Sequence, residues 1–235
     1  MPTGIIINVA AVVLGGLAGS IFGSKLSDNL KEQMNNIMGL CALCMGISAV
    51  MLMKNMPAVV FSVVLGTLIG LLIHFGIGIQ KGVGLVLNKV MKDVSQDVTD
   101  MMLTVVVLFC ASGTGIYGSL DAGMTGNHSV LIAKAVLDFF TAMIFACKLG
   151  KAVSFIGIPQ FIVMFAIFSL ARVIVPLTTD LMVADFKACG GFLLVATGLR
   201  IMKVKNFPVA DMILGMVLVM PVSYAWTTWL LPLIG

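Results

Sequence analysis

Residues 55–80 read NMPAVVFSVVLGTLIGLLIHFGIGIQ, a run that contains no Asp, Glu, Lys or Arg. A helix needs roughly 20 apolar residues to cross the ~30 Å hydrocarbon core of a bilayer, and this run is long enough. Lys54, directly before it, places a charge at one edge of the predicted span. The stretch therefore predicts a transmembrane helix.

The rest of the chain repeats this pattern. Hydrophobic residues make up 60% of the 235 residues, charged residues only 10%, and the mean hydropathy is +1.15. A soluble domain carries roughly 25% charged residues, because its surface must be hydrated. Ser129–Cys147 and Leu181–Met202 are long enough to span but carry charges. The other uncharged runs are Met1–Ser24, Gln33–Met53, Met101–Leu120, Ala152–Ala171 and Met212–Gly235.

These runs, numbered helices 1 to 8 in chain order, predict an all-α integral membrane protein with about eight transmembrane helices in a single domain, residues 1–235. Helix 4 is Met101–Leu120, helix 5 is Ser129–Cys147 and helix 6 is Ala152–Ala171. No room is left for a soluble catalytic module, so we do not expect an enzyme. Ten basic residues fall on one side of an eight-helix arrangement, which the positive-inside rule assigns to the cytoplasm. They are Lys25, Lys31, Lys81, Lys89, Lys92, Lys148, Lys151, Arg200, Lys203 and Lys205. Both termini are then predicted outside a bacterial cytoplasmic (inner) membrane.

A weak internal repeat is superimposed on the spans. Lys54-Asn55-Met56-Pro57 is echoed by Lys205-Asn206-Phe207-Pro208. With eight spans, helices 1–3 and 6–8 would be inverted copies, as in many transporters, although chance similarity is the alternative. This predicts repeat A at about 1–80, an amphipathic interfacial helix within about 81–100, central helices at about 101–150 and repeat B at about 151–235.

Two of the predicted helices look interrupted. Helix 4 contains Ser112, Gly113, Thr114 and Gly115, which are poor material for a lipid-facing helix. An unwound segment lining a polar cavity is one interpretation, and close packing of small residues is the other. In helix 6, Gly157-Ile158-Pro159-Gln160 predicts a second break, since proline removes a backbone donor.

Ionisable and amide side chains mark the candidate site. Lys134 and Asp138 are four residues apart and share one face of helix 5, either as a cation or proton site or as a self-neutralising structural pair. Asn8 and Gln160 are rough repeat counterparts that would flank a central site or merely bridge helices. The connection 121–128 is predicted to be an external loop, acting either as a gate or as an ordinary turn.

The remaining chemistry-bearing residues indicate no metal or cofactor. Cys41 and Cys44 form a C-x-x-C inside an apolar helix, with no second pair and no nearby His. We therefore expect no metal and no bound cofactor. The net charge of +4 is explained by membrane topology, so we expect no nucleic-acid partner.

The chain also resembles a known family. The segments that carry the resemblance are 4–8, 109–119, 123–126, Lys134, 137–142, Pro159-Gln160 and Gly190-Gly191. Together they are similar to the bacterial membrane proteins of domain-of-unknown-function family 554. Asn127 departs from the family pattern, where an acid is commoner. The resemblance implies a multi-spanning inner-membrane protein of transporter type and names no substrate.

The sequence thus favours a secondary transporter or channel for a small solute or ion, with its site near the bilayer centre. A membrane scaffold or regulatory protein is the alternative, and an intramembrane enzyme using Ser112 is a weaker one, since neither histidine lies nearby in sequence. The expected partners are the lipid bilayer, a small solute or ion and, in a homodimer, a second copy of the chain.

Overall fold

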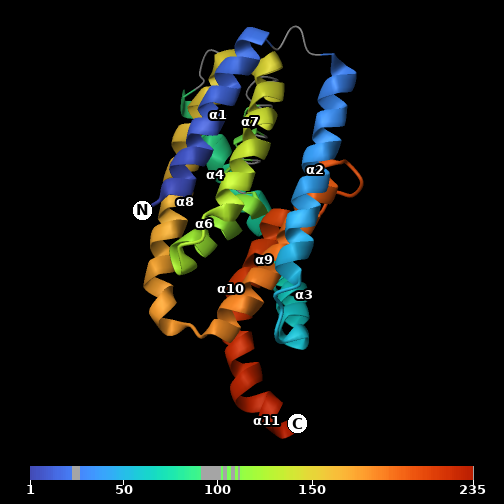
Figure 1. Ribbon diagram of the computed structural model, residues 1–235, viewed down its shortest axis with the longest axis vertical. Coiled ribbons are helices and arrows are strands. Elements are labelled where there is room, and N and C mark those ends of the chain that lie inside the picture. Colours follow the sequence, from blue (N-terminus) through green and yellow to red (C-terminus); the bar gives the residue numbers. More distant parts are fainter. Residues whose placement is uncertain (23–26, 91–101, 103–104, 107–108, 111, 235) are drawn as a thin grey trace. The chain divides into compact units, whose positions relative to one another are not determined.

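The computed structural model describes residues 1–22, 27–90, 102, 105–106, 109–110 and 112–234 (Figure 1). Within these residues the chain is helical and contains no strand. The α-helices are α1 (Thr3–Phe22), α2 (Asp28–Val50), α3 (Met56–Leu72), α4 (Phe75–Val90), α6 (Gly113–Thr125), α7 (Ser129–Leu149), α8 (Gly157–Ile174), α9 (Asp180–Ile201), α10 (Val209–Ala225) and α11 (Leu231–Ile234). Between them lie the 3₁₀ segments η2 (Gly150–Ile156) and η3 (Val175–Leu177) and the π-helical segment η4 (Trp226–Leu230).

The apolar composition is concentrated in these helices. Within the described residues, five helical stretches are long and apolar enough to cross a bilayer, or up to six if the bent pair α3–α4 counts as one span. One of the five is the 46-residue stretch Ser129–Ile174, which comprises α7, η2 and α8. Gly150 interrupts it with φ 60°, so α7 and α8 are separate helices. An all-α membrane fold is confirmed, while the number eight stays a prediction.

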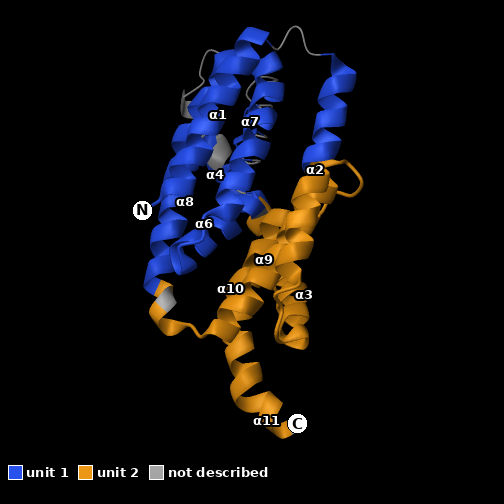
Figure 2. Cartoon of the chain, in the orientation of Figure 1, with its two compact units in different colours: residues 1–38, 77–173 blue, residues 39–76, 174–235 orange. Residues whose placement is uncertain are grey.

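The chain divides into two compact units (Figure 2). Unit 1 comprises residues 1–38 and 77–173, and unit 2 comprises residues 39–76 and 174–235. Helix α2 contributes its first part to unit 1 and the remainder to unit 2. Each unit therefore combines segments that are distant in the sequence.

In unit 1, α1 packs closely along α7. A Cβ added at Gly15 would overlap the backbone of Phe139, and one added at Gly19 would overlap the backbone of Met143. Only glycine allows the two backbones to approach this closely, as is common between membrane helices. Because the residue numbers rise together along both helices, α1 and α7 run parallel.

The other side of α1 faces η2 and the start of α8. The Ser154 hydroxyl donates a hydrogen bond to the Val13 carbonyl at 3.1 Å. Gly157 faces Val9, four residues earlier on α1. Since one number rises as the other falls, the η2–α8 segment runs antiparallel to α1 and therefore also to α7.

In unit 2, the second half of α2 packs against α9 through two pairs of glycines. Gly46 lies against Gly191, and Gly39 lies against Gly198, so the two helices are antiparallel. A Cβ added at Gly46 would lie 2.7 Å from the Gly191 carbonyl oxygen, and one at Gly191 would lie 2.7 Å from that of Gly46. The close approach is therefore mutual.

Helix α3 packs against α10 in a similar way. Gly66 lies against Gly215, and Gly70 lies against the backbone of Asp211, which makes this pair antiparallel as well. Helix α3 starts with Pro57 in its first turn, where the missing N–H costs nothing.

The predicted span 55–80 is not one straight helix. Helix α3 ends at Leu72, His74 adopts φ 54°, and α4 restarts at Phe75 with a bend of 56°. The Asp211 carboxylate accepts a hydrogen bond from the Gly76 N–H at 2.8 Å, which satisfies one of the free donors at the start of α4. Of the region of about 81–100 predicted to contain the interfacial helix, residues 81–90 belong to α4 and residues 91–100 lie outside the described residues.

Candidate functional site

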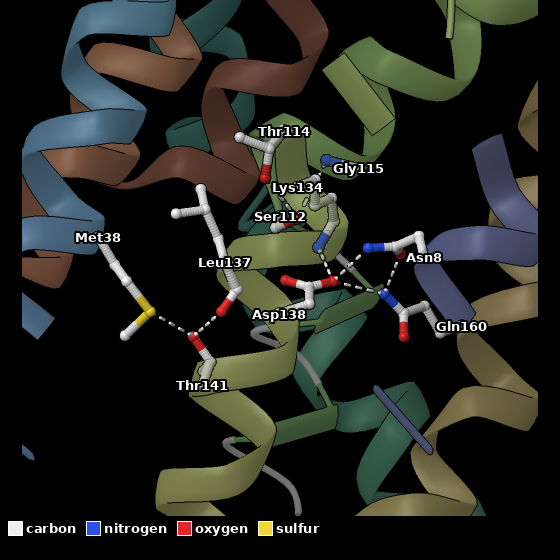
Figure 3. Close-up of polar contacts among 10 residues, drawn as sticks. All are labelled: Asn8, Met38, Ser112, Thr114, Gly115, Lys134, Leu137, Asp138, Thr141 and Gln160. Carbon is white, nitrogen blue, oxygen red and sulfur yellow. Dashed lines mark hydrogen bonds and ion pairs between the residues drawn. The ribbon is translucent and has the colours of Figure 1, made fainter. Parts of the chain in front are cut away.

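Asp138 lies at the centre of a buried polar network in unit 1 (Figure 3). Its Oδ2 atom accepts three hydrogen bonds, from Lys134 Nζ at 2.5 Å, Asn8 Nδ2 at 2.9 Å and Gln160 Nε2 at 2.9 Å. Three helices, α1, α7 and α8, thus meet at one carboxylate oxygen. Charge-assisted hydrogen bonds of this kind are the strong ones, because the acceptor is ionised.

The ion pair itself follows from helix geometry. Lys134 and Asp138 are four residues apart on α7, so their side chains lie one above the other on the same face. Lys134 is 1% exposed and Asp138 is 8% exposed. An unpaired charge at such depth would be very costly, and the pairing reduces that cost.

Asn8 and Gln160 complete the network. Gln160 Nε2 also donates to Asn8 Oδ1 at 2.7 Å, and both side chains are fully buried. With its amide nitrogen facing two acceptors, Gln160 has its carbonyl oxygen, Oε1, buried without a hydrogen-bond partner. A buried acceptor left unsatisfied is unfavourable, so this oxygen offers a place for a donor or a cation.

The first turn of α6 covers Lys134. Ser112 is the N-cap of α6, and its Oγ accepts a hydrogen bond from the Gly115 N–H at 3.1 Å. Thr114 Oγ1 lies 3.1 Å from the same Ser112 hydroxyl. A Cβ added at Gly115 would lie 3.0 Å from Lys134 Cε, so the glycine leaves room for the lysine. The Lys134 ammonium also lies 5.7 Å from the ring centroid of Phe109.

Of the predicted site residues, seven take part in these contacts. They are Asn8, Ser112, Thr114, Gly115, Lys134, Asp138 and Gln160. Gly113 is the first residue of α6. The sequence alone linked only Lys134 with Asp138 by spacing; the packing of the three helices brings the amides to the same carboxylate.

The two predicted breaks differ in detail from the expectation. Gly113 to Ser119 is helical in α6, so of the two interpretations left open for this stretch, unwinding does not apply to these residues; the helix begins after an extended Ser112. An N-cap hydroxyl and a left-handed Gly126 at the other end make a short helix favourable here despite its glycines. In helix 6 the change from 3₁₀ to α occurs at Gly157, and Pro159 lies in the first turn of α8, where proline is tolerated.

Asp121 was assigned to the wrong environment by the sequence. It was expected in an external loop, but it lies within α6 and is only 1% exposed. The Thr125 hydroxyl donates to its carboxylate at 3.0 Å. The connection between α6 and α7 is therefore shorter, residues 126–128.

Asp185 in α9 is a second buried carboxylate that sequence reasoning did not single out. The backbone N–H groups of Lys54 and Asn55 donate to Oδ1 at 2.8 and 2.9 Å. Asn55 Nδ2 donates to Oδ2 at 2.8 Å, and the Ser223 hydroxyl donates to the same oxygen at 2.6 Å. Since both oxygens are saturated, Asp185 anchors the turn before α3 and has no free position for a ligand.

The Asp138 network presents one carboxylate, one ammonium and two amides, groups that can bind a charged or hydrogen-bonding solute. Within the described residues, no group of three or more His, Cys, Asp or Glu side chains could hold a metal ion. A cavity of about 340 Å³ in unit 2 is lined by Ile174, Leu177, Thr178, Met182, Met220, Pro221 and Tyr224 and contains none of the network residues. The network therefore remains the candidate site.

Comparison with known proteins assigns the chain to a family. The family model described as "Protein of unknown function (DUF554)" matches residues 3–224. The chain belongs to the DUF554 family.

Relatives of the DUF554 chain are themselves uncharacterised. "Uncharacterized protein YqgA" of Escherichia coli (strain K12) is 46% identical over 233 residues, which cover 97% of this chain and 99% of the relative. "Uncharacterized membrane protein YdfK" of Bacillus subtilis (strain 168) is 25% identical over 216 residues, covering 89% and 90%. No solved structure matches the chain. Together with the apolar helices, these relatives identify a helical membrane protein whose activity has to be argued from its own site.

Proposed function

We propose that this DUF554 protein is a secondary transporter or channel for a small solute or ion, and that its site is the Asp138 network. The observation that carries the proposal is a buried Lys134–Asp138 ion pair surrounded by amides from two further helices. Ionisable groups inside membrane helices are rare, face the bundle interior or a water-filled cavity, and often mark ion and substrate pathways.

Energetics support this interpretation over a purely structural one. Removing two charges from water costs several kcal/mol per ion, and a buried pair is often no more stabilising than apolar side chains of the same volume. Here the pair also engages Asn8 and Gln160, which in lipid must find polar partners of their own. We attribute to a functional requirement the burial of this ion pair and its two amides in unit 1, where Ser112, Thr114, Ser119 and Asp121 are also buried.

The inverted repeat is part of the same proposal. Gly39 faces Gly198 and Gly46 faces Gly191. Gly191 lies 152 positions after Gly39, and Gly198 lies 152 positions after Gly46, so the two contacts exchange under this shift. The same separation relates Asn8 to Gln160. Contacts that exchange in this way are what a pseudo-two-fold relation between antiparallel repeats produces. In that arrangement, the Asn8–Gln160 contact joins equivalent positions of the two copies, a usual place for a substrate site.

Helix directions support the proposed topology. Because α1 and α7 run parallel, the chain between them must cross the membrane an odd number of times if both helices span it. Helix α2 and the bent pair α3–α4 account for two of these crossings. One further crossing before α7 makes the number odd and makes α7 the fifth membrane span. An eight-span protein with both termini outside fits this parity.

The function is tested with purified protein in liposomes. Uptake of radiolabelled amino acids, short carboxylates and ammonium is measured, together with a trapped pH dye under imposed Na⁺ and K⁺ gradients. At least one probe is expected to cross faster than in protein-free liposomes, and Asp138→Asn should slow it at least tenfold, or ~1.4 kcal/mol. Asp180→Asn, an exposed carboxylate on α9, is the control that should keep wild-type flux.

Two results contradict the proposal. If no probe crosses with the wild-type protein, the scaffold interpretation replaces it. If Asp138→Asn transports as the wild type does, the ion pair has only a structural role and the site lies elsewhere.

A further inference from the structure

We propose that the hydrogen-bond donors around Asp138 form a binding site for a small monovalent anion, and that the anion binds only when the Asp138 carboxyl is protonated. Each bound anion then brings one proton with it. This inference rests on the proposed function and names the class of solute that the same site takes, an anion about as large as a carboxylate group.

Convergence of three donors on one point is the first argument. Figure 3 shows nitrogen atoms of Lys134, Asn8 and Gln160 directed at the Asp138 carboxylate. Their distances to Oδ2 are 2.5, 2.9 and 2.9 Å. One ammonium and two amide groups from three helices are the donors that hold a negatively charged oxygen most strongly. The protein's own carboxylate oxygen occupies this cradle, and a solute anion of similar size would meet the same donors.

The beginning of α6 adds to the positive character of the cradle. Ser112 is the N-cap of this 13-residue helix, and the Thr114 hydroxyl lies 3.1 Å from the Ser112 hydroxyl. A Cβ added at Gly115, in the first turn, would lie 3.0 Å from Lys134 Cε. The N-terminal end of a helix carries partial positive charge and favours anions. Apart from Asp138 itself, the groups around the Lys134 ammonium therefore favour a negative charge.

Charge balance links the anion to a proton. Lys134 and Asp138 form a neutral pair, so an anion beside the ionised carboxylate would leave one net negative charge in a buried site, which is strongly unfavourable. Protonation of Asp138 restores neutrality, and the new O–H can donate a hydrogen bond to the anion. The balanced step is R′–COO⁻·⁺H₃N–R + H⁺ + A⁻ → R′–COOH + A⁻·⁺H₃N–R. Lys134 keeps its proton throughout.

Access to the cradle is through the carboxyl group. Asp138 is 8% exposed, whereas Lys134 is 1% exposed and both amides are fully buried. The proton and the anion therefore arrive from the side of Asp138. The anion takes the place that Oδ2 leaves when the neutral carboxyl turns towards that side. While the carboxylate is ionised and paired, the same place is filled, so binding and protonation occur together.

The titratable groups near Asp138 leave the proton to this carboxyl. Helices α1 and α8 contribute only uncharged amides to the network. Helix α2 reaches α7 through Met38, which lies 3.6 Å from Thr141 Oγ1, and its charged residues lie in its first two turns. The buried titratable side chains in α6 and just before it are Cys110, Tyr117 and Asp121. Asp121 accepts a hydrogen bond from Thr125, at the opposite end of α6 from Lys134.

Proton uptake on anion binding tests the inference directly. Purified wild-type protein in weakly buffered detergent solution is titrated with sodium formate, sodium acetate or NaCl, and with sodium gluconate, a much larger anion, as the control for ionic strength. Calorimetry measures binding and a pH indicator measures protons. With at least one of the three small anions we expect uptake of about one proton per anion and a roughly tenfold loss of affinity per unit rise in pH while Asp138 is ionised in the free protein. Gluconate should produce neither effect.

Variants separate the two partners. Asp138→Asn imitates the neutral acid, so it should bind the anion without proton uptake and with an affinity that does not change with pH. The anion should also raise the unfolding temperature of this variant by roughly 2–4 °C at saturation. Lys134→Arg keeps the charge and should still bind, whereas Lys134→Met should not. Asp180→Asn, exposed on α9, should behave as the wild type.

A double variant guards against misfolding. Lys134→Met leaves a buried carboxylate without its partner, which is destabilising, but Lys134→Met combined with Asp138→Asn removes both charges together. The double variant should fold and bind no anion.

Several results would overturn the anion site. These are anion binding without proton uptake in the wild type, binding that persists in the double variant, no binding by a folded Asp138→Asn protein, or a response to gluconate equal to that to formate. The liposome assay is independent: flux of a neutral or cationic solute without anion binding rejects this inference and keeps the proposed function. Binding with proton uptake but no flux of any probe supports the site and rejects transport.

Discussion

Asn8 and Gln160 are hydrogen-bonded to each other although 152 positions separate them, and both also donate to the same oxygen of Asp138. Neither side chain is exposed. Two amides from α1 and α8 therefore hold the carboxylate of α7. A displacement of any of the three helices would change the hydrogen bonds around the ion pair.

Gly115 is predicted to be required because of its size. In Gly115→Ala, the new Cβ would lie 3.0 Å from Lys134 Cε and would push the ammonium away from Asp138. We expect transport in liposomes to fall about tenfold, equivalent to ~1.4 kcal/mol. Alanine is the better helix former by about 1 kcal/mol, but its Cβ would also lie 3.1 Å from Oγ of the N-cap Ser112.

The matched control for Gly115→Ala is Gly78→Ala on α4, where an added Cβ meets nothing within 4 Å. This variant should keep wild-type activity and unfold at the same or a slightly higher temperature. Equal activity of Gly115→Ala and Gly78→Ala would show that the position of Lys134 is not important.

Asp185 is predicted to be essential for the stability of unit 2. Asp185→Ala leaves the N–H groups of Lys54 and Asn55 and the Ser223 hydroxyl without their acceptor. We expect a loss of about 3 kcal/mol in the free energy of unfolding, because several buried donors lose a charged partner. Urea or thermal unfolding in detergent measures it.

The control for Asp185→Ala is Asp180→Ala in the first turn of the same helix, where the carboxylate is exposed. Loss of its interaction with the helix dipole should cost only about 0.5 kcal/mol. A comparable effect of the two substitutions would mean that Asp185 does not anchor the turn before α3.

The glycine contacts between α2 and α9 are predicted to be sensitive to size on both sides. In Gly46→Ala and Gly191→Ala, the added Cβ would lie 2.7 Å from the facing carbonyl oxygen. Each substitution should cost about 1–3 kcal/mol because the helices must move apart. Thermal unfolding against Gly82→Ala, where the Cβ meets nothing within 4 Å, provides the comparison. Wild-type stability of both variants would exclude close packing at this position.

Topology is predicted from the basic residues and can be measured at the two ends of α7. Asn127 and Lys151 are both exposed and lie beyond opposite ends of this helix. In a background without other cysteines, Asn127→Cys should react with a membrane-impermeant maleimide in spheroplasts, since its side carries few basic residues. Lys151→Cys should react only after the membrane is permeabilised. The reverse pattern would invert the predicted orientation.

Much of the fold could be predicted from the sequence because spanning helices are local. The run that contains Asn8 and the run from Ser129 became α1 and α7 close to their expected limits. The bend at His74 was missed, since nothing in an uncharged run indicates that Asp211 of α10 receives the N–H of Gly76. Asp121 was misplaced for a related reason: an acid next to glycines is typical of a loop unless packing buries it.

The candidate site, like the fold, could be predicted from the sequence only in part. Lys134 and Asp138 could be paired from the sequence by the four-residue spacing, because that spacing places both side chains on one face of a helix. Asn8 and Gln160 could be predicted from the sequence as repeat counterparts that flank a central site or bridge helices, but not as partners of Asp138. Their contact with Asp138 joins positions 130 and 22 residues away, and no local rule predicts such distances.

By itself, then, the sequence determined that this chain is a helical membrane protein with Lys134 and Asp138 paired on one helix face, since hydropathy and helical periodicity are properties of neighbouring residues. Only the tertiary structure decided that three helices converge on Asp138, that Gly115 makes room for Lys134 and that Gln160 Oε1 is left without a partner. The physical reason is that close helix packing, made possible by glycines such as Gly15 and Gly19, sets which side chains from distant segments meet.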